Sequence, residues 1–568
     1  SETGALLSKN SYSQEFADRF TFFDTDEVNK VYTFDRTEFI GRNRNLHNPE
    51  AMQREKLSGK RSIGTDPCVA LQSQINIGAG KEYQVVYKLG AGKNYGEAKE
   101  TIKRFKGKDV AVQTLDKVRK YWADVTGAIQ VETPDKALNI MANGWLLYQT
   151  LACRMWARSG FYQSGGAYGF RDQLQDSMAM LYTKPELTRK QILLAASKQF
   201  VEGDAMHWWH PPVNRGVRTK CSDDFLWLPF VTARYLSVTG DDSIMQEQVR
   251  FIEGRQLGPD EESNYDLPNQ SNQVASIYEH CLRAIKHGLR LGEHGLPLIG
   301  TGDWNDGMDQ VGKHGKGESV WLAFFVYDIL NSFIKIAESR DDVATAAMCI
   351  AESEKLKDNI DKHAWDGKWY RRAYFDDGTP LGSESNDECK IDAIAQSWSV
   401  ISGAGDEEKR KQALESAYEL LVDKEHRILK LLTPPFNSSD LQPGYIKGYL
   451  PGIRENGGQY THAAIWLVMA FAVQQDAERA YELLRYVNPL LHGNTKQEAD
   501  KYRGEPYVMA GDVYEGEHPG QAGWTWYTGS AGWAYRLIIE YILGMKMENG
   551  EVSFSPTAPA AWDSFKVS

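Results

Sequence analysis

The feature that most constrains this chain is a long series of amphipathic segments that begins near residue 133. In the segment from Ala137 to Ala157, apolar side chains recur at the three- and four-residue spacing of one helix face. Further segments of this kind span residues 187–201, 222–239, 273–292, 317–340, 343–364, 389–403, 407–422, 459–474, 476–487 and 529–544. About a dozen antiparallel helices can close into a ring of six hairpins. The pattern therefore predicts a mainly α fold, an (α/α)6 barrel.

The first part of the chain has a different pattern. Between about residues 20 and 115, runs such as Lys30–Phe34 and Tyr83–Leu89 are rich in β-formers and are followed by Gly-rich turns. Residues 96–125 become helical and charged, which indicates a linker. After residue 545 the sequence favours a strand again, at Gly550–Phe554. We expect one large helical domain with smaller β parts, since 568 residues exceed one ordinary core.

Composition excludes several classes of protein. The net charge of −12 argues against a nucleic-acid partner, because an acidic protein repels phosphodiester backbones. We find no run of about 18 apolar residues, so we expect no membrane span and no membrane contact. Residues Ser1–Tyr12 do not resemble a secretory signal, and the missing initiator Met suggests a piece of a longer chain. The six cysteines are scattered without a C-x-x-C pair, which favours reduced thiols and a cytoplasmic location.

Aromatic residues point to carbohydrate. The chain has 16 Trp and 28 Tyr, and several lie in polar, Gly-rich segments that we expect to be loops. Aromatic faces stack on sugar rings, while their N–H and O–H groups reach sugar hydroxyls. Large cores also contain many aromatics, so only the aromatics in loops favour carbohydrate. These loops span residues 158–175, 203–221, 299–316, 433–458 and 504–528.

The strongest candidate for a catalytic segment is Gly300–Asp309, in which Asp303 and Asp306 flank a Trp-Asn pair. Cleavage of a glycosidic bond needs an acid that protonates the leaving oxygen. A carboxyl beside the indole of Trp304 would be partly desolvated and so kept protonated for that role. Asp303 could instead hold a sugar hydroxyl. Ordinary turn chemistry is the alternative, while the spacing does not fit a calcium loop.

Two further loops offer an anion site. Thr528, Gly529 and Ser530 would occupy the first turn of a helix, where free N–H groups and hydroxyls suit phosphate, although a simple N-cap is equally expected. His462 lies in the first turn of an apolar helix, where a structural role is the more common one. Arg454 and Glu455 precede it in a Gly-rich loop and suit hydroxyl or anion contacts, or a solvated ion pair.

Two segments remain to be assigned. Arg171 and Asp172 follow a Gly-rich loop and open a helix, and together they suit recognition of vicinal hydroxyls. The segment His207–Pro212, with Asp223 and Asp224 downstream, suggests zinc. Its spacing fits no standard ligand pattern and Cys221 has no partner cysteine, so we predict no metal and favour aromatic stacking.

Taken together, these segments resemble the glycoside hydrolase family 94 phosphorylases. The resemblance runs over nearly the whole chain and is carried by Gly169–Asp176, Asp303–Gly307, Arg454–Gly458 and Trp526–Ser530 in this order. The sequence looks closest to the phosphorylase module of cyclic β-1,2-glucan synthases at Thr37–Arg42, Leu57–Lys60 and Asp66–Leu71. The resemblance implies a partial antiparallel β-sandwich (1–115), a helical linker (116–132), the barrel (133–545) and the start of a small C-terminal β domain (546–568).

The resemblance also implies roles for individual residues. Asp306 matches the general acid, and the donor-sugar contacts match Asp303, Trp304, Arg171 and Asp172. Phosphate contacts match His462, Thr528 and Gly529, with Ser530 beside them, while Arg454 and Glu455 match the acceptor-side loop. Cellobiose phosphorylases carry a further phosphate-binding Arg in the loop where this chain has Gln163-Ser-Gly-Gly166. How phosphate is held without it is left open.

The implied reaction is inverting phosphorolysis of a β-glucoside, β-1,2-linked or of the cellobiose type, which gives α-glucose 1-phosphate. The reaction needs no cofactor, and inorganic phosphate is its co-substrate. The expected partners are therefore a β-linked gluco-oligosaccharide and phosphate. The chain is also expected to form a homodimer or to be part of a larger polypeptide. One alternative is an inverting (α/α)6 hydrolase, with Glu455 or Glu505 as the base that activates water. Another is a non-catalytic sugar-binding module of a cyclic glucan synthase.

Overall fold

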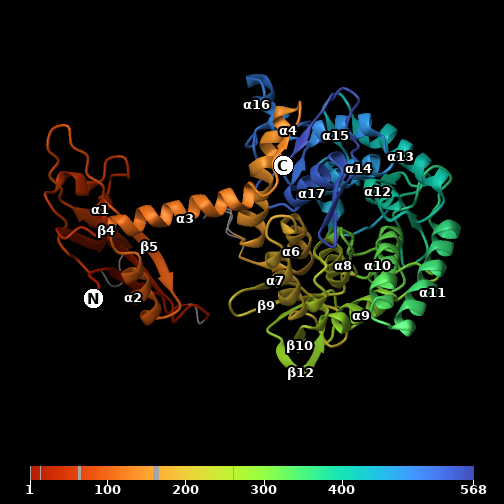
Figure 1. Cartoon of the computed structure of the whole chain (residues 1–568), viewed down its shortest axis with the longest axis horizontal. Helices are drawn as coiled ribbons and strands as arrows, with labels where there is room; N and C mark the ends of the chain where they lie inside the picture. The colour runs from red at the N-terminus through yellow and green to blue at the C-terminus, as the bar shows by residue number, and fades with distance from the viewer. Residues whose placement is uncertain (1, 13–14, 62–65, 158–165, 260) are drawn as a thin grey trace. The chain divides into compact units, whose positions relative to one another are not determined.

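The computed structural model describes residues 2–12, 15–61, 66–157, 166–259 and 261–568. The chain divides into two compact units, Ser1–Ala123 and Asp124–Ser568 (Figure 1). We had expected the β region to end near residue 115 and the barrel to begin near residue 133. The division instead falls within helix α3 (Lys108–Thr126), inside the stretch predicted to be a helical linker.

The smaller unit contains two antiparallel sheets. One has the order β1-β2-β5 and the other pairs β3 with β4: β1 (Leu6–Lys9), β2 (Phe20–Thr25), β3 (Lys30–Asp35), β4 (Pro67–Ser73) and β5 (Tyr87–Gly92). Phe22 packs in a small core with Ala98 and Ile102 of helix α2 (Tyr95–Arg104). The strand predicted at Lys30–Phe34 is confirmed, whereas the one predicted from Tyr83 begins only at Tyr87.

The larger unit is a helical barrel. Its first helix runs from α4 (Lys136–Ile140) through α5 (Leu146–Tyr148) to Met155. The later helices in the described residues are α6 (Phe170–Ser177), α7 (Pro185–Ala196), α8 (Trp227–Thr239), α9 (Ile277–Gly288), α10 (Val320–Glu338), α11 (Val343–Asn359), α12 (Ala393–Ser402), α13 (Glu407–Leu421), α14 (Thr461–Val473), α15 (Ala477–Val487), α16 (Lys496–Tyr502) and α17 (Ser530–Arg536). Apart from the short α16 and α6, which overlaps the loop predicted at residues 158–175, they follow the predicted segments closely.

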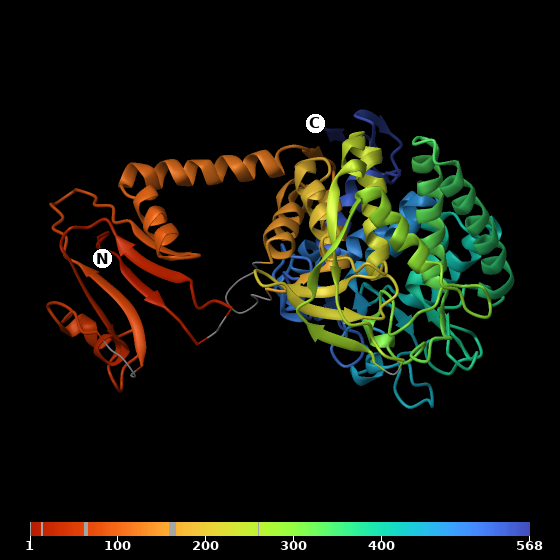
Figure 2. The same ribbon diagram turned by 90° about the horizontal axis from the view of Figure 1, so that it is seen from below.

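The helices close into a double ring. Within the described residues, α6, α8, α10, α12, α14 and α17 contact one another in succession, and α17 contacts α6. Each of them also packs against one outer helix, namely α7, α9, α11, α13, α15 or α5. Figures 1 and 2 show the helices arranged around this ring. The predicted (α/α)6 barrel is confirmed.

Aromatic side chains fill the inside of the ring. Trp227, Trp321, Trp398 and Trp466 come from four different inner helices and are fully buried, and the Trp398 and Trp466 ring centroids are 5.3 Å apart. Helix α14 is covered on all sides, with Thr461 to Ala472 buried, and it is apolar on nearly all sides, as expected for a buried helix. Helix α10 is long and apolar enough to cross a membrane by composition, so our statement that no such run exists is wrong. Its apolar surface packs against α8, α11 and α12 instead.

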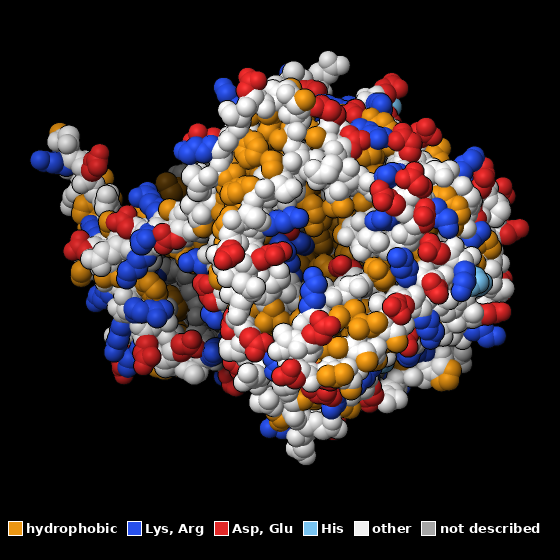
Figure 3. All heavy atoms as spheres, turned by 45° about the vertical axis from the view of Figure 1, so that its right-hand side comes forward, with side chains coloured by type: hydrophobic (Ala, Val, Ile, Leu, Met, Phe, Trp, Pro, Cys, Tyr) orange, Lys and Arg blue, Asp and Glu red, His pale blue; other side chains and the backbone are white. Residues whose placement is uncertain are grey.

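Short β-strands lie in the segments that connect the barrel helices. A four-stranded sheet has the order β11-β9-β8-β7, where β7 is Tyr168–Gly169, β8 is Met206–His210, β9 is Arg215–Thr219 and β11 is Ser263–Asp266. Residues 546–568, predicted to begin a C-terminal β domain, supply most of the hairpin of β22 (Met545–Glu548) and β23 (Glu551–Phe554). They also supply strand β24 (Lys566–Val567), which pairs with β6 (Val131–Glu132). They belong to the larger unit. One face of the larger unit is hollowed, with basic and hydrophobic side chains at the hollow (Figure 3).

Candidate active site

The predicted site residues gather where the inner helices begin. Inner helices of such a ring run in one direction, so their N-termini share one end of the barrel. Backbone N–H groups without helical partners make that end favourable for anions and carboxylates. The groups placed there are Arg171 and Asp172 on α6, Asp223 and Asp224 before α8, Ser319 as N-cap of α10, Asp392 as N-cap of α12, His462 on α14, and Thr528 to Ser530 at α17.

Asp306 lies at the centre of this end of the barrel. It opens a 3-10 turn after Gly302, whose φ of +118° only glycine adopts readily. The Nη2 group of Arg171 donates to Asp306 Oδ1 at 2.6 Å, and His207 Nε2 lies 3.6 Å from Oδ2. The side chain remains 37% exposed, so Asp306 can still meet a substrate.

The charge state of Asp306 differs from our expectation. Burial alone would raise the pKa of this carboxyl, but the charges of Arg171 and His207 outweigh it and hold the pKa below its ordinary value. Trp304 packs instead against Tyr460, His462 and Trp466. The prediction that an indole keeps this carboxyl protonated is therefore wrong for the free protein. A general acid here needs a proton from elsewhere.

Asp303 is also placed differently from the prediction. It is fully buried, and its two oxygens accept from both Nη groups of Arg372 at 2.6 and 2.7 Å. Ser319 Oγ and the backbone N–H of Asn305 also donate to it. With both oxygens occupied and no exposed surface, Asp303 holds the loop of Asp306 in place, and its contact with a sugar stays a prediction. Sequence reasoning missed Arg372, which is distant in sequence and carries no motif.

Arg171 and Asp172 point in different directions. Arg171 is buried, and its Nη1 donates to Asp223 Oδ1 and to the carbonyl of Asp303, both at 2.7 Å. The guanidinium thus orients Asp306, and the predicted recognition of vicinal hydroxyls by Arg171 stays a prediction. Asp172 is 46% exposed and accepts from Arg154 Nη2 at 3.0 Å. It is the better placed of the two for a sugar hydroxyl.

Arg154 is a functional candidate that sequence reasoning missed. It is buried at the end of the first barrel helix, where it also donates from Nε to Asp176 Oδ2 at 2.9 Å. Its guanidinium lies 4.3 Å from the ring centre of Tyr527, next to Thr528. Burial raises the pKa of Asp176 to about 7 against the charge of Arg154. A charged residue inside the apolar run Leu151-Ala-Cys-Arg154 was the available signal.

Thr528, Gly529 and Ser530 lie at the start of α17, as predicted, and their role as an anion site stays a prediction. Thr528 Oγ1 and Ser530 Oγ are 2.9 Å apart, and Thr528 Oγ1 accepts from the N–H of Ser530. A side chain at Gly529 would meet the His462 ring. Burial, and then the charge of Arg154, lower the pKa of His462 to about 3, so its imidazole is neutral at pH 7. Its buried Nε2 has no hydrogen-bond partner among the described residues.

Arg454 and Glu455 lie in the loop that contacts Asn305 and Trp524. The Arg454 guanidinium lies over the rings of Tyr449 and Trp524, at 4.8 and 4.6 Å. Glu455 accepts from Asn305 Nδ2 at 3.0 Å, which ties it to the loop of Asp306. Burial raises the pKa of Glu455 to about 7, against this hydrogen bond. At neutral pH the carboxyl therefore exists in both forms.

The residues considered as zinc ligands do lie close together, but the guanidinium of Arg171 lies among them. One ligand atom each of His207, Cys221 and Asp224 lies within 4.8 Å of the others. Arg171 Nη1 is 3.7 Å from Cys221 Sγ, and Nε is 3.7 Å from Asp224 Oδ1. A metal ion would be repelled by this guanidinium, and we assign none. Gln163, in the loop expected to lack the phosphate-binding Arg, lies outside the described residues.

Two family descriptions match the chain with this geometry. "Glycosyl hydrolase 94 superfamily, catalytic domain" matches residues 121–544, and "Glycosyl hydrolase 94, supersandwich domain" matches residues 1–108. The chain belongs to glycosyl hydrolase family 94. The catalytic-domain match contains every predicted site residue, and the predicted sandwich coincides with the supersandwich match.

Members of family 94 and one solved structure show how far the similarity extends. The chain is 46% identical to the cyclic beta-(1,2)-glucan synthase NdvB of Rhizobium meliloti (strain 1021), over 99% of this chain and 20% of that protein. It is 27% identical to an N,N'-diacetylchitobiose phosphorylase of Vibrio furnissii, over 96% of this chain and 68% of that protein. A bacterial glucoamylase complexed with acarbose shares the fold, with 11% identity, a TM-score of 0.54 and coverage of 94% and 73%.

Proposed function

We propose that the chain catalyses inverting phosphorolysis of a β-glucoside, which releases α-glucose 1-phosphate. The observation that carries the proposal is the neutral His462 ring, whose Nδ1 lies against Gly529, the residue between the hydroxyls of Thr528 and Ser530. A neutral imidazole with its proton on Nδ1 would donate to one phosphate oxygen, and the hydroxyls would donate to others. Arg154 would supply the positive charge nearby.

Asp306 would protonate the glycosidic oxygen opposite this anion turn. The Trp304 ring, two residues before Asp306, lies 5.3 Å from the His462 ring, and His462 in turn lies against Gly529, so this ring lies between the acid loop and the anion turn. A bound sugar between them would receive phosphate on one face and lose its leaving group on the other. Phosphate is already anionic, so this reaction needs no base to activate the nucleophile.

One observation supports an inverting hydrolase as the second candidate. The pKa of Glu455, about 7, suits a general base that activates water near neutral pH. Purified protein with a β-linked gluco-oligosaccharide, tested with and without phosphate, separates the two. We expect α-glucose 1-phosphate to form only when phosphate is present. Release of glucose at the same rate without phosphate would refute the phosphorylase proposal.

The substrate we propose is a β-1,2-linked gluco-oligosaccharide, with a cellobiose-type substrate as the alternative. Support comes from the similarity to the cyclic beta-(1,2)-glucan synthase, of which the chain spans 20% of the length. Synthesis in reverse from α-glucose 1-phosphate tests it, and sophorose should outperform glucose as acceptor. Exclusive formation of cellobiose from glucose would contradict it. A homodimer, a place within a longer polypeptide, a cytoplasmic location and the lack of a cofactor stay predictions.

A further inference from the structure

We propose that His207 is a positioning residue that stores the proton which Asp306 passes to the leaving group. This inference rests on the proposed function. His207 lies on β8 with its ring between two carboxylates: Nδ1 is 2.8 Å from Asp224 Oδ2, and Nε2 is 3.6 Å from Asp306 Oδ2. The arrangement Asp224–His207–Asp306 is a line of titratable groups, with the imidazole between two carboxylates, that ends at the predicted acid.

The need for a proton store follows from the surroundings of Asp306. Arg171 contacts Asp306 at 2.6 Å and favours the carboxylate, which has no proton to donate. An imidazolium beside a carboxylate and a neutral imidazole beside a carboxylic acid have the same total number of protons. The two forms differ only in which group binds the shared proton. When a sugar displaces water from the site, the proton can move from Nε2 to Oδ2 without any exchange with solvent. The pair is thus ready for acid catalysis although Asp306 alone is ionised.

The charges around His207 keep it protonated. Burial would lower the pKa of the imidazole, but Asp224 and Asp306 outweigh burial and raise it well above its ordinary value. Burial would raise the pKa of Asp172, but the charges of Arg154, Arg171 and His207 outweigh it and lower this pKa. Cys221, the remaining titratable neighbour, keeps its proton because burial raises the pKa of its thiol.

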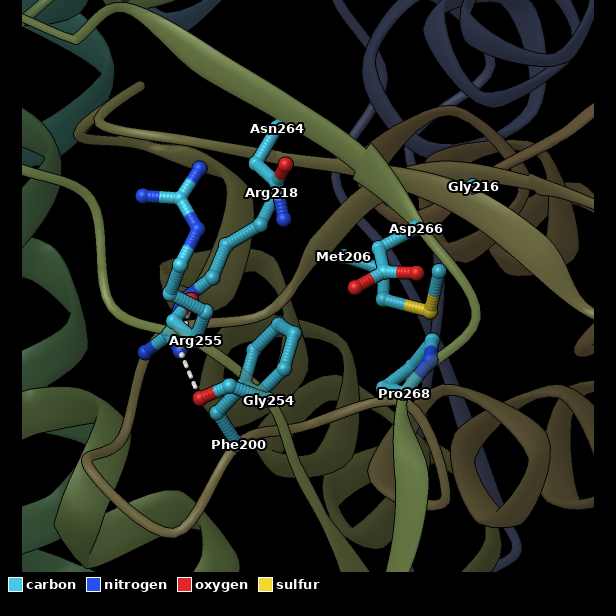
Figure 4. A pocket seen from close by; sticks show the side chains of 9 residues that line it. All are labelled: Phe200, Met206, Gly216, Arg218, Gly254, Arg255, Asn264, Asp266 and Pro268. Atoms are coloured by element: carbon cyan, nitrogen blue, oxygen red, sulfur yellow. Dashed lines mark hydrogen bonds between the residues drawn. The ribbon is translucent and has the colours of Figure 1, made fainter.

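The fold fixes the strand that carries His207. Strands β8 and β9 form a hairpin, and Arg218 on β9 donates to both oxygens of Asp204 at 2.7 Å. The same guanidinium lies 3.8 Å from the ring centre of Phe200, beside a pocket of only about 20 Å³ that Figure 4 shows. That volume admits about one water molecule and no sugar. The hairpin is therefore a rigid support for His207 and not a second binding site.

The proton balance closes over one turnover. The Nε2–H bond of His207 breaks as the Oδ2–H bond of Asp306 forms, and that proton then bonds to the glycosidic oxygen as the C1–O bond breaks. Phosphate oxygen forms the new bond to C1. Hydrogen phosphate brings one proton, which the sugar phosphate product releases, and this proton restores the imidazolium. No further reactant is needed.

The test compares leaving groups in His207→Asn. With a β-1,2-linked gluco-oligosaccharide and phosphate, we expect kcat to fall about a hundredfold, because the leaving alkoxide needs a proton. With 2,4-dinitrophenyl β-glucoside, whose leaving group departs without a proton, we expect kcat close to that of the original protein. An equal loss on both substrates would show a structural role and overturn the proposal.

The pH profile gives an independent readout. The Asp306–His207 pair keeps its proton up to the raised pKa of the imidazole, and activity falls as the pH rises through that value. In His207→Asn only the carboxyl can hold the proton, and Arg171 lowers its pKa. The alkaline limb of kcat/KM should therefore move about two pH units or more toward acid. An unchanged limb would overturn the proposal, even if the aryl glucoside is not a substrate.

Matched variants separate the possible failures. His426→Asn removes another imidazole whose Nδ1 is 2.8 Å from a carboxylate, that of Asp423, and should leave the pH profile unchanged. His207→Gln and Asp224→Asn repeat the test if His207→Asn does not fold. If the original protein forms no α-glucose 1-phosphate with phosphate, the proposed function fails. If it does and the His207 variants keep its pH profile, only the proton store fails.

Discussion

The buried contact between Asp303 and Arg372 offers the sharpest test of how the site is built. In Asp303→Asn, one carboxylate oxygen becomes an amide N–H₂ that faces the N–H donors of Arg372, and the buried guanidinium loses its main counter-charge. The nearest remaining carboxylate is Asp392, at 3.6 Å from Arg372 Nε. Breaking a buried ion pair from one side costs about 3–5 kcal/mol. We expect the free energy of unfolding to fall by that amount and Tm to fall by roughly 5 °C.

Thermal unfolding of the original protein, Asp303→Asn and a control measures this effect. The control is Asp242→Asn, which breaks an exposed ion pair with Arg340 at 2.9 Å and should cost less than about 1 kcal/mol. If Asp303 were a sugar contact, its variant would match the control in Tm and raise KM for the oligosaccharide. That result would refute the structural role assigned here.

Three further predictions concern chemistry and pH. Asp306→Asn should lower kcat about 10²–10⁴-fold with little change in Tm, measured as release of α-glucose 1-phosphate; retention of more than a tenth of the activity would exclude Asp306 as the acid. Thr528→Val should raise KM for phosphate about tenfold and leave KM for the sugar unchanged, because a hydrogen bond to an anion is lost; equal changes in both would contradict an anion site. Glu540 is buried between Arg234 and Arg536, and although burial raises its pKa, these charges lower it to about 2. Its stabilising contribution should be complete above about pH 4.5 and be lost as the pH falls toward 2, and Glu540→Gln should flatten the dependence of Tm on pH in that range.

Most of the helices and strands could be predicted from the local spacing of apolar residues. The helical spacing of apolar residues located the barrel helices, because a helix that packs on one side must repeat its apolar face regardless of its partners. The strand at Lys30–Asp35 followed from β-branched and aromatic alternation in the same way. The strand expected from Tyr83 failed for residues 83–86, where β-formers are present but the pairing with β2 begins only at Tyr87.

The sequence by itself therefore determined the helix and strand pattern, the loops that hold the site and the identity of Asp306, His462 and Thr528 as candidates, since all of these depend on residues close together in the chain. Only the tertiary structure decided what each charge does. It placed Arg372 on Asp303 and Arg171 on Asp306, across 69 and 135 residues of chain, and so made one carboxylate structural and the other ionised. The physical reason is that burial and neighbouring charges set the state of a carboxyl, and both are properties of the folded ring of helices and not of the local sequence.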